Sequence, residues 1–166
     1  MALTIEDGSV VADADSLIDT ADFRAYAVSR GVNDLSTDDE VVDALLRKAM
    51  DFINAQRSRF QGVKVDEGQS LQWPRSGVYV DGFPVAADSI HPDLINAQCE
   101  LAIALHNGVD LQPNENGREV IRKKLDVIET QWSAKGVTAV PILRAAEALL
   151  EPFYKVATGG LTTIRV

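Results

Sequence analysis

Side chains suited to chemistry are scarce in this sequence, which has two histidines and one cysteine. Neither His91 nor His106 has a second histidine or a cysteine three or four positions away, the spacing of a metal site on a helix. His91 precedes Pro92, where a capping role is the simpler interpretation, and Cys99 falls on the apolar side of an expected helix, as a small core residue would. Phosphate-binding loops, dinucleotide fingerprints and serine-nucleophile motifs are missing. We therefore expect no enzyme, no metal site and no cofactor.

One stretch, residues 69–100, combines several residues that fix backbone shape. It contains Trp73-Pro74-Arg75, a glycine-containing connection and the start of an expected helix. Loops held in one shape by glycine and proline usually carry contacts. Trp73 and Trp132 could stack on nucleic-acid bases, but packing within the protein is the favoured interpretation. The stretch predicts an interface and leaves its partner open.

Negative charge is concentrated near the beginning of the chain. The net charge is −9, and residues 1–51 contain twelve acids against four bases, whereas the rest is nearly neutral. A protein that grips nucleic-acid phosphates needs a basic surface. Only a local patch around Arg57, Arg59, Lys64 and Arg75 could supply one. The charge balance argues against strong nucleic-acid binding.

Hydrophobic spacing and capping residues predict four helices. They cover 21–30 with Thr20 as N-cap and Gly31 as stop, 38 to about 56–59 behind a Thr37–Glu40 capping box, 92–107 opened by Pro92, and 139 or 140 to 150 opened by Pro141. Residues 1–19 lack helical periodicity and are expected to form an extended arm.

Two further segments allow more than one interpretation. In residues 118–133, the apolar positions fit helical spacing, but they also alternate with charged residues as in a strand. At the end of the chain, a Gly159-Gly160 hinge precedes the β-prone run LTTIRV. Such a run is typical of a strand that adds to a partner's sheet edge. A frayed terminus is the alternative.

An ordered set of residues resembles one family. The set begins with Gln69, Leu71 and Trp73-Pro74-Arg75, continues through Asp81-Gly82-Phe83-Pro84-Val85, and ends with Ala97, Glu100, Leu101 and Ala102. Flanking segments extend the similarity over most of the chain. The chain is similar to tailed-phage proteins often labelled DnaT-like single-stranded-DNA-binding proteins, and to the head–tail connector (adaptor, or head-completion) proteins of such phages.

The resemblance implies a mainly α fold. We expect a small helical bundle of about four helices, a β-hairpin at about 118–133, and extended N- and C-terminal arms. The resemblance thus assigns 118–133 to strands. One connector domain is expected over 1–157, with 1–19 as its N-terminal arm, and a docking tail over 158–166.

The resemblance also implies a structural role in the virion neck, after assembly in the host cytoplasm. We expect a ring of about twelve copies that contacts the portal protein, neighbouring copies and a neck or tail-completion protein, and no membrane. Double-stranded DNA would pass through its lumen without specific binding. The expected portal-docking residues are Gly159, Gly160, Leu161, Thr162, Thr163, Ile164, Arg165 and Val166. The residues expected to anchor the loop or contact another subunit are Trp73, Pro74, Arg75, Gly77, Tyr79 and Phe83, with Arg75 pairing with a neighbour's acid.

The two family labels make opposite demands on charge. A single-strand binder needs a basic groove and stacking aromatics, whereas a ring that lets duplex DNA slide benefits from an acidic or neutral lumen. The acids of residues 1–51 favour the connector. Single-stranded-DNA binding in phage replication is the alternative, and an assembly chaperone that leaves the particle is a third hypothesis. Oligonucleotide titration across salt distinguishes the first two.

Overall fold

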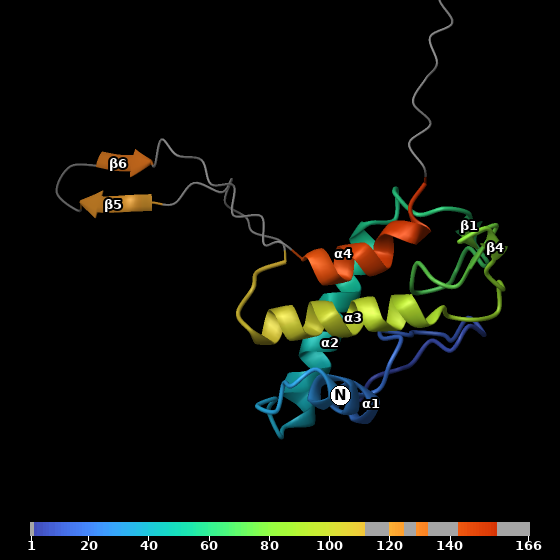
Figure 1. Cartoon of the computed structure of the whole chain (residues 1–166), viewed down its shortest axis with the longest axis horizontal. Helices are drawn as coiled ribbons and strands as arrows, with labels where there is room; N and C mark the ends of the chain where they lie inside the picture. The colour runs from blue at the N-terminus through green and yellow to red at the C-terminus, as the bar shows by residue number, and fades with distance from the viewer. Residues whose placement is uncertain (1, 112–119, 125–128, 133–142, 156–166) are drawn as a thin grey trace, which may run out of the picture.

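The computed structural model describes residues 2–111, 120–124, 129–132 and 143–155. Within them lie four α-helices and three short antiparallel strand pairs, which confirms the expected mainly α bundle with a hairpin (Figure 1). None of the described helices is both long and apolar enough to cross a lipid bilayer.

Helix α1 (Thr20–Ser29) begins one residue earlier than expected. The carboxylate of Asp19 accepts a hydrogen bond from the N–H of Asp22 and caps the helix, so the prediction of Thr20 as N-cap is wrong. An aspartate adds negative charge at the partly positive N-terminus, which the threonine hydroxyl cannot supply. The helix ends before Gly31, whose φ of 82° is typical of such a stop.

Helix α2 (Asp39–Ala55) likewise uses an aspartate as its cap. The side chain of Asp38 accepts a hydrogen bond from the N–H of Glu40, so the predicted capping box with Thr37 is wrong. The helix also stops slightly before the expected range. Its buried stripe has helical spacing and consists of Val42, Leu46, Ala49, Met50 and Ile53.

Helix α3 (Pro92–His106) starts and stops as its sequence predicts. His91 caps it, because its Nδ1 accepts a hydrogen bond from the N–H of Asp93 at 3.2 Å. Gly108, with a φ of 80°, follows the end. Cys99 is fully buried on this helix, as expected of a core residue. Helix α3 packs against both α2 and α4, so it forms the centre of the bundle (Figure 1).

Helix α4 (Arg144–Leu150) continues into a 3-10 turn, η1 (Glu151–Phe153). Residues 139–142, where this helix was expected to start, lie outside the described residues. Leu143 has non-helical backbone angles, so the described helix begins after it, later than the sequence predicts. Ala146, Leu150 and Phe153 are buried against the core.

Each of the described strands pairs with its neighbour in sequence. The pairs are β1 (Val63–Lys64) with β2 (Arg75–Ser76), β3 (Tyr79–Val80) with β4 (Phe83–Pro84), and β5 (Val120–Lys124) with β6 (Glu129–Trp132). The last pair confirms the hairpin assigned to 118–133, with Lys124 opposite Glu129 and Val120 opposite Trp132.

One buried glutamine ties the N-terminal residues to the bundle. Gln98 of α3 is fully buried. Its side-chain oxygen accepts a hydrogen bond from the N–H of Leu17 at 2.9 Å. Its amide nitrogen donates to Ser16 Oγ and to the carbonyl of Leu46 in α2, at 2.9 and 3.0 Å. The end of the expected N-terminal arm is therefore fastened between α2 and α3.

Candidate functional site

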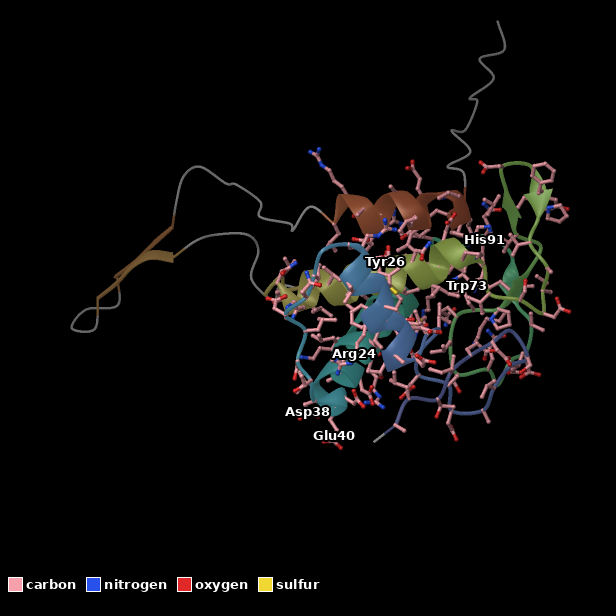
Figure 2. The ribbon with its side chains drawn as sticks, turned by 60° about the horizontal axis from the view of Figure 1, so that its bottom comes forward. Arg24, Tyr26, Asp38, Glu40, Trp73 and His91 are labelled. Carbon is pink, nitrogen blue, oxygen red and sulfur yellow. The ribbon has the colours of Figure 1, made fainter. Side chains whose placement is uncertain are left out.

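The constrained loop is built around buried aromatic rings. Trp73 is 1% exposed, and its ring meets Phe60 and Phe153 edge to face at centroid distances of 5.4 and 5.2 Å. The ring of His91 contacts Phe153 from another direction at 5.2 Å, and Figure 2 shows His91 and Trp73 in the same part of the molecule. Trp73 Nε1 is buried and has no hydrogen-bond partner among the described residues. These contacts fasten the loop to η1 and to the segment after α2.

Arg75, one of the residues expected to anchor the loop or contact another subunit, makes its described contacts inside the chain. It is 7% exposed, and its guanidinium donates to the carbonyls of Gln61 and Gly62 at 2.7 and 2.8 Å. Burial lowers the pKa of its guanidinium from the usual value. Among the described residues no carboxylate forms an ion pair with it. Arg75 therefore holds the 61–62 backbone against β2 and is not part of a surface basic patch.

Two aromatic rings project from the β3–β4 hairpin. Tyr79 is 57% exposed and Phe83 is 75% exposed, whereas Val80 is buried. The turn between the strands is Asp81-Gly82, both with positive φ, which matches the type I′ turn that such pairs favour. In the strand register Tyr79 lies opposite Pro84 and Val80 opposite Phe83, so the two rings belong to opposite faces of the hairpin.

The hairpin is held in place by the side chain of Gln61. Its amide nitrogen donates to the carbonyls of Tyr79 and Pro152 at 3.2 and 2.7 Å, and its oxygen accepts from the N–H of Tyr79 at 3.2 Å. Gln61 thus bridges the hairpin to η1. The hairpin that carries the two exposed rings is therefore joined to η1 at Tyr79.

Exposed basic residues lie next to the β3–β4 hairpin and η1. Arg59 places its guanidinium carbon 3.8 Å from the centroid of the Tyr154 ring. The main chain of Lys155 donates to the carbonyl of Arg59 at 2.7 Å, and its ammonium donates to the carbonyl of Ser58 at 3.2 Å. Arg57 is exposed two residues before Arg59 in the chain. Rings and bases therefore share one end of the molecule, here named the aromatic end: Arg57, Arg59, Tyr79, Phe83, Tyr154 and Lys155.

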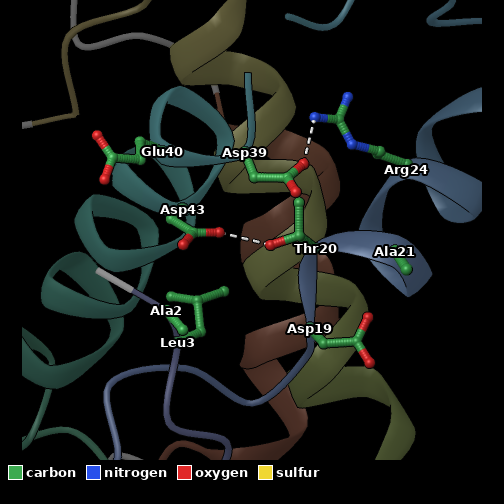
Figure 3. A pocket seen from close by; sticks show the side chains of 9 residues that line it. All are labelled: Ala2, Leu3, Asp19, Thr20, Ala21, Arg24, Asp39, Glu40 and Asp43. Carbon is green, nitrogen blue, oxygen red and sulfur yellow. Dashed lines mark hydrogen bonds and ion pairs between the residues drawn. The ribbon is translucent and has the colours of Figure 1, made fainter. Parts of the chain in front are cut away.

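The acids of α1 and α2 lie elsewhere. Asp38 and Glu40, at the start of α2, lie far from Trp73 and His91 in Figure 2. A hollow of about 660 Å³ between the N-terminal residues, α1 and α2 is lined by four of these acids (Figure 3): Asp19, Asp39, Glu40 and Asp43. Arg24 pairs with Asp39 there at 2.9 Å. The carboxylates of this hollow would repel a nucleic-acid strand, so the aromatic end is the better candidate site.

The remaining predicted site residues are distributed as follows. Pro74 is buried with Trp73, and Gly77 is exposed with a φ of 74°. The predicted docking residues 159–166 lie outside the described residues. In the described part of the chain, no three His, Cys, Asp or Glu side chains are grouped as a metal site requires.

Sequence reasoning missed Gln61, Tyr154 and Lys155. The β3–β4 hairpin could have been predicted, because Asp81-Gly82 between aromatic residues is typical of a tight hairpin turn. Nothing in the sequence indicates the role of Tyr154, since its contact with Arg59 joins residues far apart in the chain.

A family model matches the chain over residues 1–166, and its description is "Putative DnaT-like ssDNA binding protein". The chain belongs to this family. No curated protein and no solved structure gives a significant match. The predicted membership of a head–tail connector family is therefore wrong, because the description of the matching family names DNA binding and not connector assembly.

Proposed function

We propose that this protein binds single-stranded DNA, and that it does so at the aromatic end. The observation that carries the proposal is the match of the DnaT-like family model over the whole chain. The exposed rings and bases of the aromatic end support it, because this combination suits a single strand.

The rings favour a single strand over a duplex. Bases in a duplex are stacked on each other, whereas the unpaired bases of a single strand can stack on protein aromatics. Such stacking contributes about 1–3 kcal/mol per base and tolerates any sequence. Tyr79 and Phe83 are exposed on a hairpin that Gln61 holds in place, which makes them available for such stacking.

The charges predict weak dependence on salt. Arg57, Arg59 and Lys155 are the exposed bases of the aromatic end. If about three phosphates are contacted, the logarithm of the binding constant falls with the logarithm of salt concentration with a slope of roughly −2. The acidic residues of α1 and α2 would confine the strand to this end of the molecule.

Fluorescence anisotropy with a labelled oligonucleotide tests the proposal. Replacing both rings, Tyr79→Ser with Phe83→Ser, should weaken binding about tenfold or more, because two stacking contacts are lost. Val28→Ser is the matched control: Val28 is 58% exposed on α1, away from the aromatic end, and its replacement should leave binding unchanged. A wild-type protein that fails to bind any oligonucleotide at low salt would refute the proposal.

Other expectations concern the cell and the particle. Location in a virion, contact with a portal protein, assembly as a ring of copies and passage of duplex DNA stay predictions that none of these observations tests. Lack of enzymatic activity stays a prediction as well.

A further inference from the structure

A second stacking surface lies beside the hairpin and ends in a guanidinium. The Tyr154 ring stacks on Phe60 at a centroid distance of 5.5 Å and an interplanar angle of 28°. Arg59 lies over the same ring at 3.8 Å and so fills one face of it. Arg59 Nη1 donates to the Gln56 side-chain oxygen at 3.1 Å, which orients the guanidinium plane. Arg59 is exposed and lines a hollow, so its guanidinium is accessible to another flat group.

This guanidinium borders a hollow of about 360 Å³, within the range of small-ligand sites. The hollow lies between α4, η1 and Arg59, and its charged lining consists of Arg59, Arg144, Glu147 and Glu151. Among the described residues, no ion pair links these arginines to these glutamates. Within the described part of the chain, neither carboxylate has a hydrogen-bond or ion-pair partner. Both lie beside a surface on which a flat ring can stack.

We propose that the hollow is a base subsite that prefers guanine, which deepens and rests on the proposed binding of single-stranded DNA. A base stacks on the Arg59 guanidinium, and a carboxylate of Glu147 or Glu151 accepts hydrogen bonds from its Watson–Crick edge. A ring of the hairpin can hold another base of the strand, since Gln61 joins β3 to η1 next to the hollow.

The preference follows from the donors that each base presents. A carboxylate only accepts hydrogen bonds, and its two oxygens match two parallel donors. Guanine presents two such donors side by side on its Watson–Crick edge, the N1–H and the N2 amine. Adenine and cytosine present one exocyclic amine beside an acceptor nitrogen, and thymine presents one N–H between two carbonyl oxygens. Guanine alone can make the bidentate contact, and only when unpaired.

The test uses fluorescence anisotropy to measure how tightly the protein binds labelled oligothymidylates that carry one central dG, dA or dC. The dG strand should bind about fivefold or more tightly than the others, the discrimination of one bidentate contact. In the double variant Glu147→Gln with Glu151→Gln, each amide offers one acceptor and a donor, so the dG advantage should vanish while binding of the plain oligothymidylate persists. Glu67→Gln, an exposed acid outside the hollow, is the control and should keep the advantage.

A second pair of variants tests the stacking surface. Arg59→Lys keeps the charge but removes the plane, so it should weaken the dG strand more than Arg57→Lys does. Binding without base preference, or a dG preference that survives the double glutamate variant, would overturn the subsite and leave the proposed function standing. No binding of any strand would overturn both.

Discussion

Replacing Arg75 by methionine tests how the loop beneath the candidate site is held. Methionine keeps an unbranched apolar stem but cannot donate to the carbonyls of Gln61 and Gly62, which the guanidinium contacts at 2.7 and 2.8 Å. Hydrogen bonds from a charged donor contribute about 1.5–3 kcal/mol each. Part of that gain is offset by the cost of burying the charge, which is also why the pKa of Arg75 is lowered. We expect a net loss of roughly 2–4 kcal/mol in the free energy of unfolding.

Urea unfolding followed by far-ultraviolet circular dichroism measures this loss. A domain of ordinary stability, about 5–15 kcal/mol, should still fold with the Arg75→Met change. The midpoint should fall while the denaturant slope stays constant. Arg57→Met is the matched control, because Arg57 is exposed, and it should change stability by less than about 0.5 kcal/mol. If Arg75→Met is as stable as this control, the guanidinium does not hold the loop and the reasoning is refuted.

Three further predictions use the same measurement or a simple variant of it. Gly31→Ala should cost about 1–2 kcal/mol, because Gly31 has a positive φ. Gly62→Ala should cost more, because a Cβ there would also lie 2.1 Å from the carbonyl oxygen of Ser76. Equal losses of stability in the two variants would contradict this contact. Gln98→Leu should cost roughly 1–3 kcal/mol, since it leaves the buried N–H of Leu17 without its partner; an unchanged unfolding midpoint would contradict this. Burial raises the pKa of Cys99 from 9.0 to about 12, so between these pH values the unfolded chain releases a proton that the folded chain retains. The free energy of unfolding should therefore fall more steeply above pH 9 in the wild type than in Cys99→Ala. Identical pH profiles of the two proteins would count against the burial.

Local signals account for the parts of the fold that sequence reasoning predicted well. Helix α3 has a proline in its first turn and a glycine after its end, and these act through the backbone of their own neighbourhood. The errors at the starts of α1 and α2 also arose locally, because adjacent residues competed for one cap and the aspartate was chosen over the threonine. The assignment of 118–133 to strands needed the family resemblance, since its spacing suited both structures.

The candidate site was less predictable than the fold. An arginine beside a tryptophan in a rigid loop looks like a surface contact, and nothing in the sequence shows that Arg75 instead points to the carbonyls of Gln61 and Gly62. Backbone carbonyls are present at every residue, so they leave no mark in the pattern of side chains. Because Arg75 is buried, it does not belong to the basic patch that the sequence suggested, and the aromatic end is formed by other residues.

By itself, the sequence determined the body of the helices and the placement of acids before residue 52, and it contains the Asp81-Gly82 pair typical of a tight turn, although that hairpin was not predicted. Each of these depends on neighbouring residues or on composition, so no tertiary contact is needed to see it. Only the tertiary structure decided that Arg59 lies over Tyr154, and that Gln61 joins the hairpin to η1. These contacts close loops of many residues, and their free energy comes from packing that exists only once the bundle has formed. The acidic composition thus describes the chain as a whole, whereas the structure separates the acids of α1 and α2 from the aromatic end, where we propose that a single strand binds.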